Sequence, residues 1–178
     1  NDVKRDCVEM GAPPEAMNRI FSEHGFNAGR LEKHAEDAYA VYDCLGVCSE
    51  GGRTTWEPVR NVPLLAEMYP AATGFDITTP EMKKRGERVW NLQKLLNVRE
   101  GFTRKDDEVP ALWLKNTETP LKLKGGDKYL VDWFGRPVSS SDIQQMMDDY
   151  YDERGWDIKK GVPTKEKLAE LGLGQFTA

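Results

Sequence analysis

The first half of the chain repeats apolar residues at helical spacing. Residues 11–24 place Met17, Ile20 and Phe21 at positions i, i+3 and i+4, and a glycine follows the segment. Residues 29–47 have a longer apolar stripe with acidic side chains beside it. The stripe consists of Leu31, Ala35, Ala38, Tyr39, Tyr42 and Leu45. Both segments predict amphipathic helices.

Residues that start and stop helices predict two further helices in the middle of the chain. Residues 63–72 are short and apolar, and Gly74 closes them. Residues 79–81, Thr-Pro-Glu, combine a cap, a proline in the first turn and an acidic side chain, as helix starts do. The helix that they start is predicted to run to about Asn97.

The C-terminal part predicts two more helices. Residues 141–144, Ser-Asp-Ile-Gln, have the spacing of a capping box and start a helix to about Arg154. Three aromatic residues within 150–156 surround its end, and we interpret them as core packing against a glycine turn. Thr164 caps a last short helix that ends at Gly172.

Residues 98–135 interrupt this helical pattern with several glycines and prolines. We predict a long irregular segment with one short strand at 129–133. Such a segment inside a compact domain is more often functional or an interface than idle. The predicted fold class is therefore mainly α, an irregular helical domain with long ordered loops.

The composition mainly excludes classes of protein. The chain has 178 residues and a net charge of −5, which fits one domain and argues against a basic face for duplex DNA. It has no apolar run long enough for a membrane helix and opens on no secretory leader. An odd number of cysteines (Cys7, Cys44 and Cys48) then indicates a reducing compartment. Because the chain begins with Asn1, we expect a processed chain or a piece of a longer polypeptide.

Most residue patterns for cofactor chemistry are absent from this sequence. It contains no phosphate-binding glycine loop, no CxxC and no HExxH. The two histidines, His24 and His34, lie at a predicted helix end and among acidic residues, and we interpret both as structural.

The hexapeptide from Asp43 to Cys48 is the most informative candidate. Asp43 falls near a helix end, and Gly46 lets the backbone turn or approach a ligand. A thiolate just beyond could bind a soft metal. From spacing alone, two buried reduced cysteines, Cys44 and Cys48, are the commoner explanation. One cysteine cannot hold a cluster that needs about four thiolates.

Neighbouring carboxylates are another candidate for acid–base or cation chemistry. The pairs 148–149 and 152–153 lie on a predicted helix with few cations nearby, which favours a solvated face. The pair 106–107 follows Arg104 and Lys105 in the irregular segment. That cluster fits a polar loop beside a ligand or interface and a surface salt-bridge network about equally.

Taken together, these segments resemble one family. Asp43-x-x-Gly46-Val47-Cys48 resembles the Asp-x-x-Gly-Leu-Cys motif of tungsten-dependent aldehyde:ferredoxin oxidoreductases, with Val47 in place of the usual leucine. Further segments resemble the same family in the same order. They are Ala71–Thr78, Gly86–Leu92, Asn97–Asp107, Tyr150–Trp156 and Gly161–Thr164. Each segment alone is weak, but their order along residues 35–173 is specific.

The resemblance implies a cofactor site. Members of the family bind tungsten, or molybdenum in relatives, through two molybdopterin-type dithiolenes, with a [4Fe–4S] cluster beside one pterin. They oxidise aldehydes to carboxylic acids and pass electrons to ferredoxin. The resemblance assigns Asp43 to a hydrogen bond with the pterin and the backbone at Gly46, Val47 and Cys48 to its lining. It makes Cys48 the fourth cluster ligand and gives Cys44 and Cys7 no role.

The family pattern also contains parts that this sequence lacks. These are the other three cluster cysteines, the N-terminal β domain and the upstream pocket residues. We therefore expect residues 1–178 to form one helical C-terminal domain, inactive alone and without tungsten or a cluster when isolated. The expected partners are the rest of the parent polypeptide, ferredoxin and an aldehyde, in an anaerobic prokaryotic cytoplasm, with no nucleic acid or membrane.

Two alternatives remain open from the sequence. The equivalent domain of a tungsten-dependent aromatic acyl-CoA reductase subunit shares the pterin motifs. A stand-alone, non-catalytic helical module would share only the fold.

Overall fold

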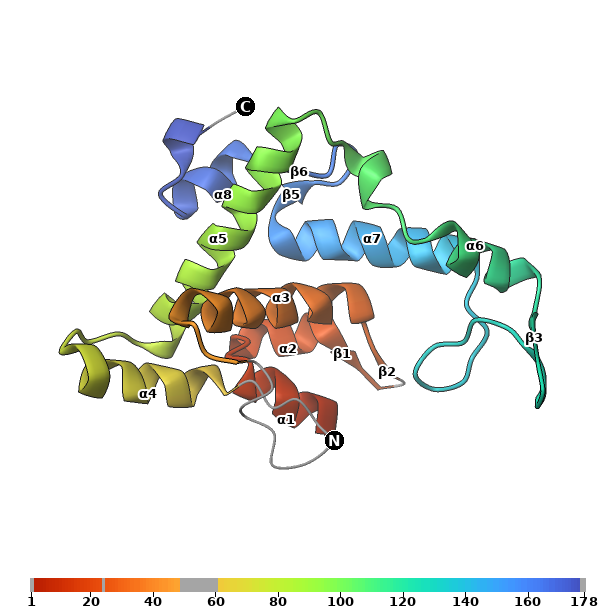
Figure 1. Cartoon of the computed structure of the whole chain (residues 1–178), viewed down its shortest axis with the longest axis horizontal. Helices are drawn as coiled ribbons and strands as arrows, with labels where there is room; N and C mark the ends of the chain where they lie inside the picture. Colours follow the sequence, from red (N-terminus) through yellow and green to blue (C-terminus); the bar gives the residue numbers. More distant parts are fainter. Residues whose placement is uncertain (1, 24, 49–60, 177–178) are drawn as a thin grey trace.

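The computed structural model describes residues 2–23, 25–48 and 61–176, and most of them are helical (Figure 1). The α-helices are α1 (Asp2–Glu9), α2 (Pro14–Ile20), α3 (Ala28–Leu45), α4 (Val62–Thr73), α5 (Thr79–Arg99), α6 (Ala111–Glu118), α7 (Ser140–Arg154) and α8 (Lys165–Glu170). The 3-10 helices are η1 (Arg104–Asp107) and η2 (Gly174–Phe176). The prediction of a mainly α fold is confirmed.

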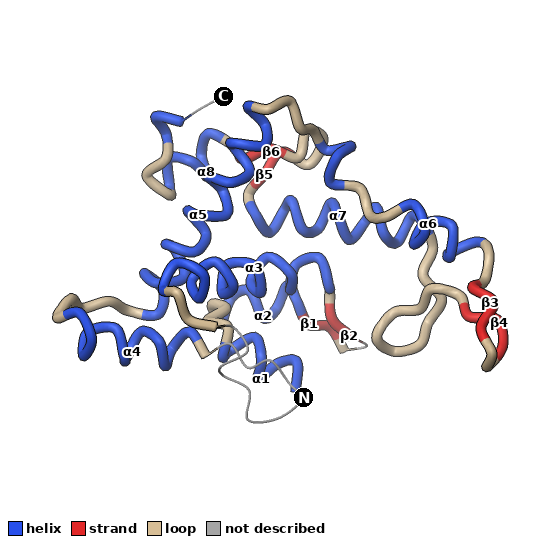
Figure 2. Tube along the Cα trace, in the orientation of Figure 1, coloured by secondary structure: helices blue, strands red, loops and turns tan. Residues whose placement is uncertain are grey.

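Strands in the described ranges occur as short antiparallel pairs (Figure 2). The pairs are β1 (Phe21–Ser22) with β2 (Gly25–Phe26), β3 (Leu121–Leu123) with β4 (Gly126–Lys128), and β5 (Trp156–Asp157) with β6 (Val162–Pro163). Among the described helices, none has the length and apolar character that crossing a membrane requires.

The N-terminal region departs from its prediction. Helix α2 ends at Ile20 rather than near residue 24, because Phe21 pairs with Phe26 in the β1–β2 hairpin. Helix α1 precedes it, and no pattern in the sequence predicted that helix. His24 lies outside the described residues. Helices α3, α4 and α8 form close to where the sequence predicts them.

Two helices begin slightly earlier than predicted because their caps lie further upstream. The α5 cap is Thr78, whose hydroxyl accepts from the Glu81 amide while the Glu81 carboxylate accepts from the Thr78 amide. The α7 cap is Ser139, which makes the same exchange with Asp142. A carboxylate three residues after the cap is a stronger acceptor than the Gln144 amide of the predicted box.

The segment 98–135 contains more regular structure than predicted. It holds η1, α6 and the β3–β4 hairpin. Gly126 has a φ of 104°, so the tight turn and the pairing form there. The prediction of a strand at 129–133 is wrong. This stretch forms an isolated bridge between Val131 and Pro137 and no strand.

Helix α3 lies at the centre of the fold (Figure 1) and contacts α5 and α7. A glycine lies at each of these two contacts. A Cβ at Gly86 of α5 would lie 2.3 Å from the carbonyl oxygen of Asp37. A Cβ at Gly29 would lie 2.1 Å from the carbonyl oxygen of Met146 on α7. These contacts are backbone against backbone, so the two crossings leave no room for side chains. The main apolar cluster around α3 includes Cys7, Ile20, Ala38, Val41, Val62 and Met82.

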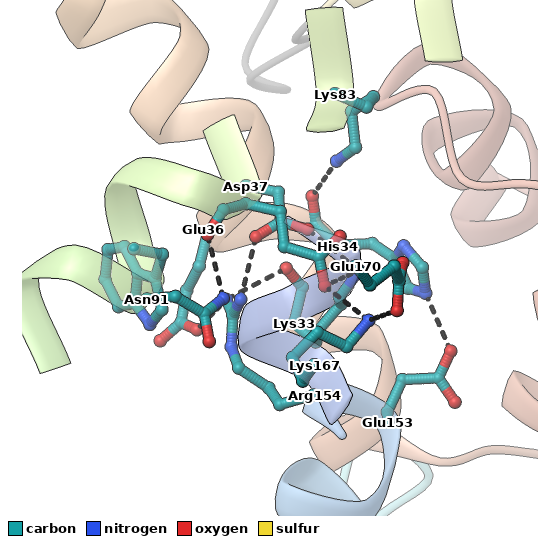
Figure 3. A network of polar contacts seen from close by, with 12 residues as sticks. Lys33, His34, Glu36, Asp37, Lys83, Asn91, Glu153, Arg154, Lys167 and Glu170 are labelled. Atoms are coloured by element: carbon teal, nitrogen blue, oxygen red, sulfur yellow. Dashed lines mark hydrogen bonds and ion pairs between the residues drawn. The ribbon is translucent and has the colours of Figure 1, made fainter. Parts of the chain in front are cut away.

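A buried arginine joins α7 to α3 (Figure 3). The Arg154 side chain has no exposed surface, and its Nη1 donates to Asp37 Oδ1 at 2.8 Å. Its Nη2 donates to Glu36 Oε2 at 2.6 Å and to the Lys33 carbonyl at 3.2 Å, and its Nε donates to the Tyr150 hydroxyl at 2.9 Å. Burial alone would raise the pKa of Asp37, but Arg154 and Lys33 lower it to about 2.

The network continues from α3 to α5 and α8. Lys33 Nζ lies 2.9 Å from Asp37 Oδ2 and 3.5 Å from Glu87 Oε1. The same Glu87 oxygen lies 3.2 Å from Lys167 Nζ. Alternating charges therefore join four helices through side chains that are at most 15% exposed, where each charge depends on its neighbours.

The prediction of a solvated acidic face on α7 is wrong for Asp149 and Glu153, whereas Asp148 and Asp152 keep much of their side chains exposed. The Glu153 side chain is 2% exposed and lies between Arg19, Arg30 and His34, with its closest ion pair at 2.7 Å to Arg19. Burial opposes ionisation of Glu153, but the hydrogen bonds from Arg19 and His34 hold its pKa well below the usual range. Arg30 also pairs with Asp149 and Asp152. These cations come from elements more than 100 residues away, so local charge counting cannot detect them.

Replacing Arg154 should destabilise the fold more than replacing an exposed arginine. Arg154→Met leaves Asp37 buried with Lys33 as its remaining ion-pair partner and removes the cation that pairs with Glu36, at a cost of about 3–5 kcal/mol in the free energy of unfolding. Arg136→Met is the control, since the Arg136 side chain is exposed and its pair with Asp132 lies at the surface, where losing it should cost much less. Urea denaturation of both variants measures the difference, and equal costs would show that Arg154 is not the anchor.

The buried Lys83 should make stability depend on pH above neutrality. Its Nζ donates to the His34 carbonyl at 2.7 Å. Burial lowers its pKa to about 7, with Asp37 opposing. The unfolded chain keeps this lysine protonated to about pH 10, so from pH 7 to about 8.5 the unfolded state binds more protons than the folded state. The free energy of unfolding should therefore rise with pH, by at most ~1.4 kcal/mol per pH unit.

Urea titrations at a series of pH values measure this slope. Lys83→Met should remove it, whereas Lys84→Met at the next, exposed position should keep it. The buried Cys7 thiol, whose pKa burial raises to about 11, acts with the opposite sign above about pH 8.5 and limits the range. A flat profile for the unsubstituted chain between these limits would contradict the assignment to Lys83.

Candidate functional site

The predicted site residues lie where α3 ends. Gly46 has a φ of 65°, and its amide donates to the carbonyls of Asp43 and Tyr42. The amide of Val47 also donates to the Tyr42 carbonyl, at 3.1 Å. This glycine cap stops the helix and turns the chain outward toward Cys48.

The end of α3 is open on the surface of the described chain. Asp43, Cys44, Gly46, Val47 and Cys48 are all exposed. A Cβ at Gly46 would meet no atom within 4 Å. The interpretation of Cys44 and Cys48 as buried thiols is therefore wrong, and both are free and exposed. The structure brings the predicted residues together at one accessible helix end.

Cys7 is the thiol that packs in the core. Its side chain is fully buried, and burial raises its pKa to about 11. A thiol in that state is a poor nucleophile and a poor metal ligand. Cys7 therefore differs in exposure and reactivity from Cys44 and Cys48, the two cysteines near Gly46.

The α4–α5 connection contains a second segment singled out by the sequence. Helix α4 ends at Gly74 with a φ of 77°, and the Thr73 hydroxyl bridges the Tyr69 carbonyl and the Phe75 amide. Phe75 is 70% exposed beyond this turn. Figure 1 shows this connection on the same side of the molecule as the end of α3.

The segment that follows α5 lies at the other end of that helix (Figure 1). Asp107 accepts from Lys94 and from the Tyr151 hydroxyl, the latter at 2.7 Å. Arg104 pairs with Asp148 at 2.6 Å and lies 5.0 Å from the centre of the Tyr151 ring. The salt-bridge network considered for this cluster is therefore present. Because α5 has 21 residues, about 30 Å of helix separates its two ends.

The aromatic residues near the end of α7 form core, as the sequence predicts. Tyr151 is fully buried, and Trp156 donates to Asn91 Oδ1 at 2.9 Å. What the sequence did not predict is that Arg154 lies among these rings, about 5–6 Å from the centres of Trp90, Tyr150 and Trp156. The one available signal was an arginine flanked by aromatics just before a helix-ending glycine.

His34 has a structural place in this core. Its side chain is 2% exposed, and its Nε2 lies 3.1 Å from Glu153 Oε1. Burial lowers its pKa, and its Nδ1 has no hydrogen-bond partner in the described ranges. A neutral ring that donates from Nε2 satisfies both observations, which agrees with the structural interpretation of this histidine.

Comparisons with known proteins agree with the motifs. Residues 4–173 match the family model for aldehyde ferredoxin oxidoreductase, domains 2 and 3. The chain is 36% identical over 111 residues to the tungsten-containing aldehyde ferredoxin oxidoreductase of Pyrococcus furiosus, covering 62% of this chain and 16% of that protein. It is 34% identical over 142 residues to the enzyme of the same name from Pyrococcus horikoshii, covering 79% and 20%. The chain thus spans a fifth or less of these relatives.

A solved structure shares the fold. The chain resembles the active-site complex BamBC of benzoyl-coenzyme A reductase with 1,5-dienoyl-CoA, with a TM-score of 0.65 and 21% identity. The likeness covers 98% of this chain and 26% of that one. With the family model matching nearly the whole length, the resemblance drawn from the motifs is confirmed, and the chain belongs to the aldehyde ferredoxin oxidoreductase family, to the part that comprises its domains 2 and 3.

Proposed function

We propose that this chain is the C-terminal domain of a tungstopterin aldehyde:ferredoxin oxidoreductase. Asp43, Gly46 and Val47 contribute one pterin-binding motif, and Cys48 contributes the fourth cysteine of a [4Fe–4S] cluster. The observation that supports this is the exposed hexapeptide at the end of α3 in a chain of this family. The parent enzyme would oxidise aldehydes to carboxylic acids and pass the electrons to ferredoxin.

The residues present fit a shared site rather than a complete one. An accessible thiol and a carboxylate lie near a helix end whose glycine leaves open space. A [4Fe–4S] cluster needs about four thiolates. Within the described ranges no three His, Cys, Asp or Glu side chains gather as a metal site. The other cluster ligands would come from the longer polypeptide, and we propose that residues 1–178 alone hold no cofactor and have no activity.

Each residue has a separate task in this proposal. The Asp43 carboxylate accepts hydrogen bonds and so suits the donor-rich edge of a pterin. Gly46 turns the backbone without a side chain, which lets a flat ring approach the peptide. The Cys48 thiolate suits iron and, next to the pterin, shortens the path for electrons. The bound tungsten–pterin group would supply the two-electron oxidation of the aldehyde.

A second candidate is the equivalent domain of an aromatic acyl-CoA reductase subunit. It is favoured by the fold shared with the benzoyl-coenzyme A reductase complex over 98% of this chain. Turnover of an aldehyde but not of an aromatic acyl-CoA thioester by the parent enzyme would decide for the first candidate. A stand-alone helical module would turn over neither.

The proposal includes a cellular setting. Two exposed free thiols are best preserved in a reducing compartment, so we propose the cytoplasm of an anaerobic prokaryote. The partners are the rest of the parent polypeptide, ferredoxin and the aldehyde, without nucleic acid or membrane.

Cys48→Ala in the parent enzyme should remove or destabilise the iron–sulfur cluster, because each iron needs its thiolate. Iron content and the electron paramagnetic resonance signal of the reduced protein measure the loss. Cys44→Ala is the matched control, an exposed cysteine at the same helix end, and should leave iron unchanged. Cys7→Ala should change stability only. Full cluster occupancy in Cys48→Ala would rule out the assignment.

Asp43→Asn should weaken pterin binding while leaving the fold intact. The substitution keeps the size and turns one acceptor into a donor that faces donors, at a cost of about 1–3 kcal/mol. Pterin content and aldehyde turnover of the parent should fall, and the melting temperature of cofactor-free protein should not. Asp127→Asn, at an exposed position on the β3–β4 hairpin, is the control. Unchanged pterin content would remove Asp43 from the site and leave the family assignment in place.

A further inference from the structure

Two turns far apart in the sequence meet beyond the C-terminal end of α5 (Figure 1). One is the connection from α5 to η1, which begins at Gly101 with a φ of 92°. The other joins β5 to β6 and is closed by Asp157, whose Oδ1 accepts from the amides of Lys159 and Lys160 at 2.9 Å each. The Arg104 guanidinium donates to the carbonyl of Ile158 and so fastens the first turn to the second.

An open, shallow cleft of about 580 Å³ lies between these turns. Its size is in the usual range of small-molecule sites, about 300–1,000 Å³. Its apolar lining comes from Val98, Phe102 and Val162. Phe102 is half exposed, so part of its apolar surface is open to a ligand. An adjoining hollow of about 220 Å³ shares Arg104, Lys105 and Lys159 with the cleft.

The cleft has an excess of unpaired positive charge. Lys105, Lys159 and Lys160 line it, are exposed, and form no ion pair with any residue in the described ranges. Glu108 is the acidic residue that lines the adjoining hollow. Asp148 is nearby but is already paired with Arg104. Asp106 and Asp157 also lie in these turns, and each accepts hydrogen bonds within its own turn. Three lysines without an ion-pair partner in the described ranges therefore remain to attract an anion.

We propose that this cleft binds an organic anion, a carboxylate or phosphate group attached to an apolar body. The lysine ammonium groups would hold the head group, and Phe102 with Val98 and Val162 would cover the body. Backbone hydrogen bonds and Arg104 hold both turns, so the backbone of the site is preorganised and the ordering cost of binding falls on the lysine side chains. This proposal goes beyond the function proposed above, because it concerns the opposite end of α5 from Asp43 and requires no cofactor.

Isothermal titration calorimetry on the 178-residue chain tests the proposal with four probes. Phenyl phosphate and benzoate share the apolar body and differ in the head group, so they distinguish the two anions. Benzyl alcohol lacks the charge, and inorganic phosphate lacks the body. We expect one or both aromatic anions to bind at least about tenfold more tightly than either control probe, and to weaken as salt is raised.

Variants then locate the binding. The double variant Lys159→Gln/Lys160→Gln removes two charges and leaves the turn intact, because Asp157 binds the backbone amides of these residues. It should weaken binding of the aromatic anion about tenfold or more, whereas Lys128→Gln, an exposed lysine on β4, should not. Phe102→Ala should weaken binding of whichever aromatic anion binds and leave the affinity for inorganic phosphate unchanged. Circular dichroism confirms that each variant is folded.

Three results would overturn the proposal. The first is no detectable binding of either aromatic anion. The second is equal affinity of the double lysine variant and Lys128→Gln, which would place the binding elsewhere. The third is that neither aromatic anion binds more tightly than inorganic phosphate, which would leave only non-specific attraction of ions to lysines. None of these results depends on cofactor content, so failure here is distinct from failure of the Asp43 and Cys48 assignments.

Discussion

The Arg154 guanidinium is the group on which the packing of α3, α5 and α7 depends. It is fully buried, and its donors are used by two carboxylates, a carbonyl and a hydroxyl. A buried ion pair adds little net stability compared with a pair of apolar side chains of similar volume, but a charge whose partner is displaced destabilises the fold strongly. Its main effect here is therefore on specificity, because only one register of α7 against α3 satisfies Arg154, Glu36 and Asp37 together.

The glycine crossings impose the same register by contact rather than charge. Gly86 and Gly29 place the backbones of α5 and α7 directly against α3. Sliding either helix by one residue would bring a side chain against a carbonyl and would also remove the partners of the buried network. Both constraints act on the segment of α3 that precedes Asp43. The direction in which the exposed residues at its end point is thus determined by contacts deep in the core.

The sequence predicts those parts of the structure that depend on neighbouring residues. Caps, glycine stops and apolar spacing locate α3, α4, α5, α7 and α8 with small errors in their ends. It does not predict features that depend on distant pairing. The acidic residues of α7 look solvated because their cations, such as Arg19 and Arg30, come from the opposite end of the chain. For Cys44 and Cys48 the error has the opposite sign, because the sequence predicts them to be buried and they are exposed. Their spacing does not reveal whether other chain segments cover them.

The exposure of two thiols near Gly46 has a consequence for handling the protein in air. Oxidation follows thiolate access, so Cys44 and Cys48 should react with oxygen or peroxide long before the enclosed Cys7. Damage would begin at the surface end of α3, while the helical core and its spectroscopic signature stayed native. A sample could therefore look fully folded after Cys48, the cysteine that we propose as a cluster ligand, had already become a sulfenic or sulfinic acid.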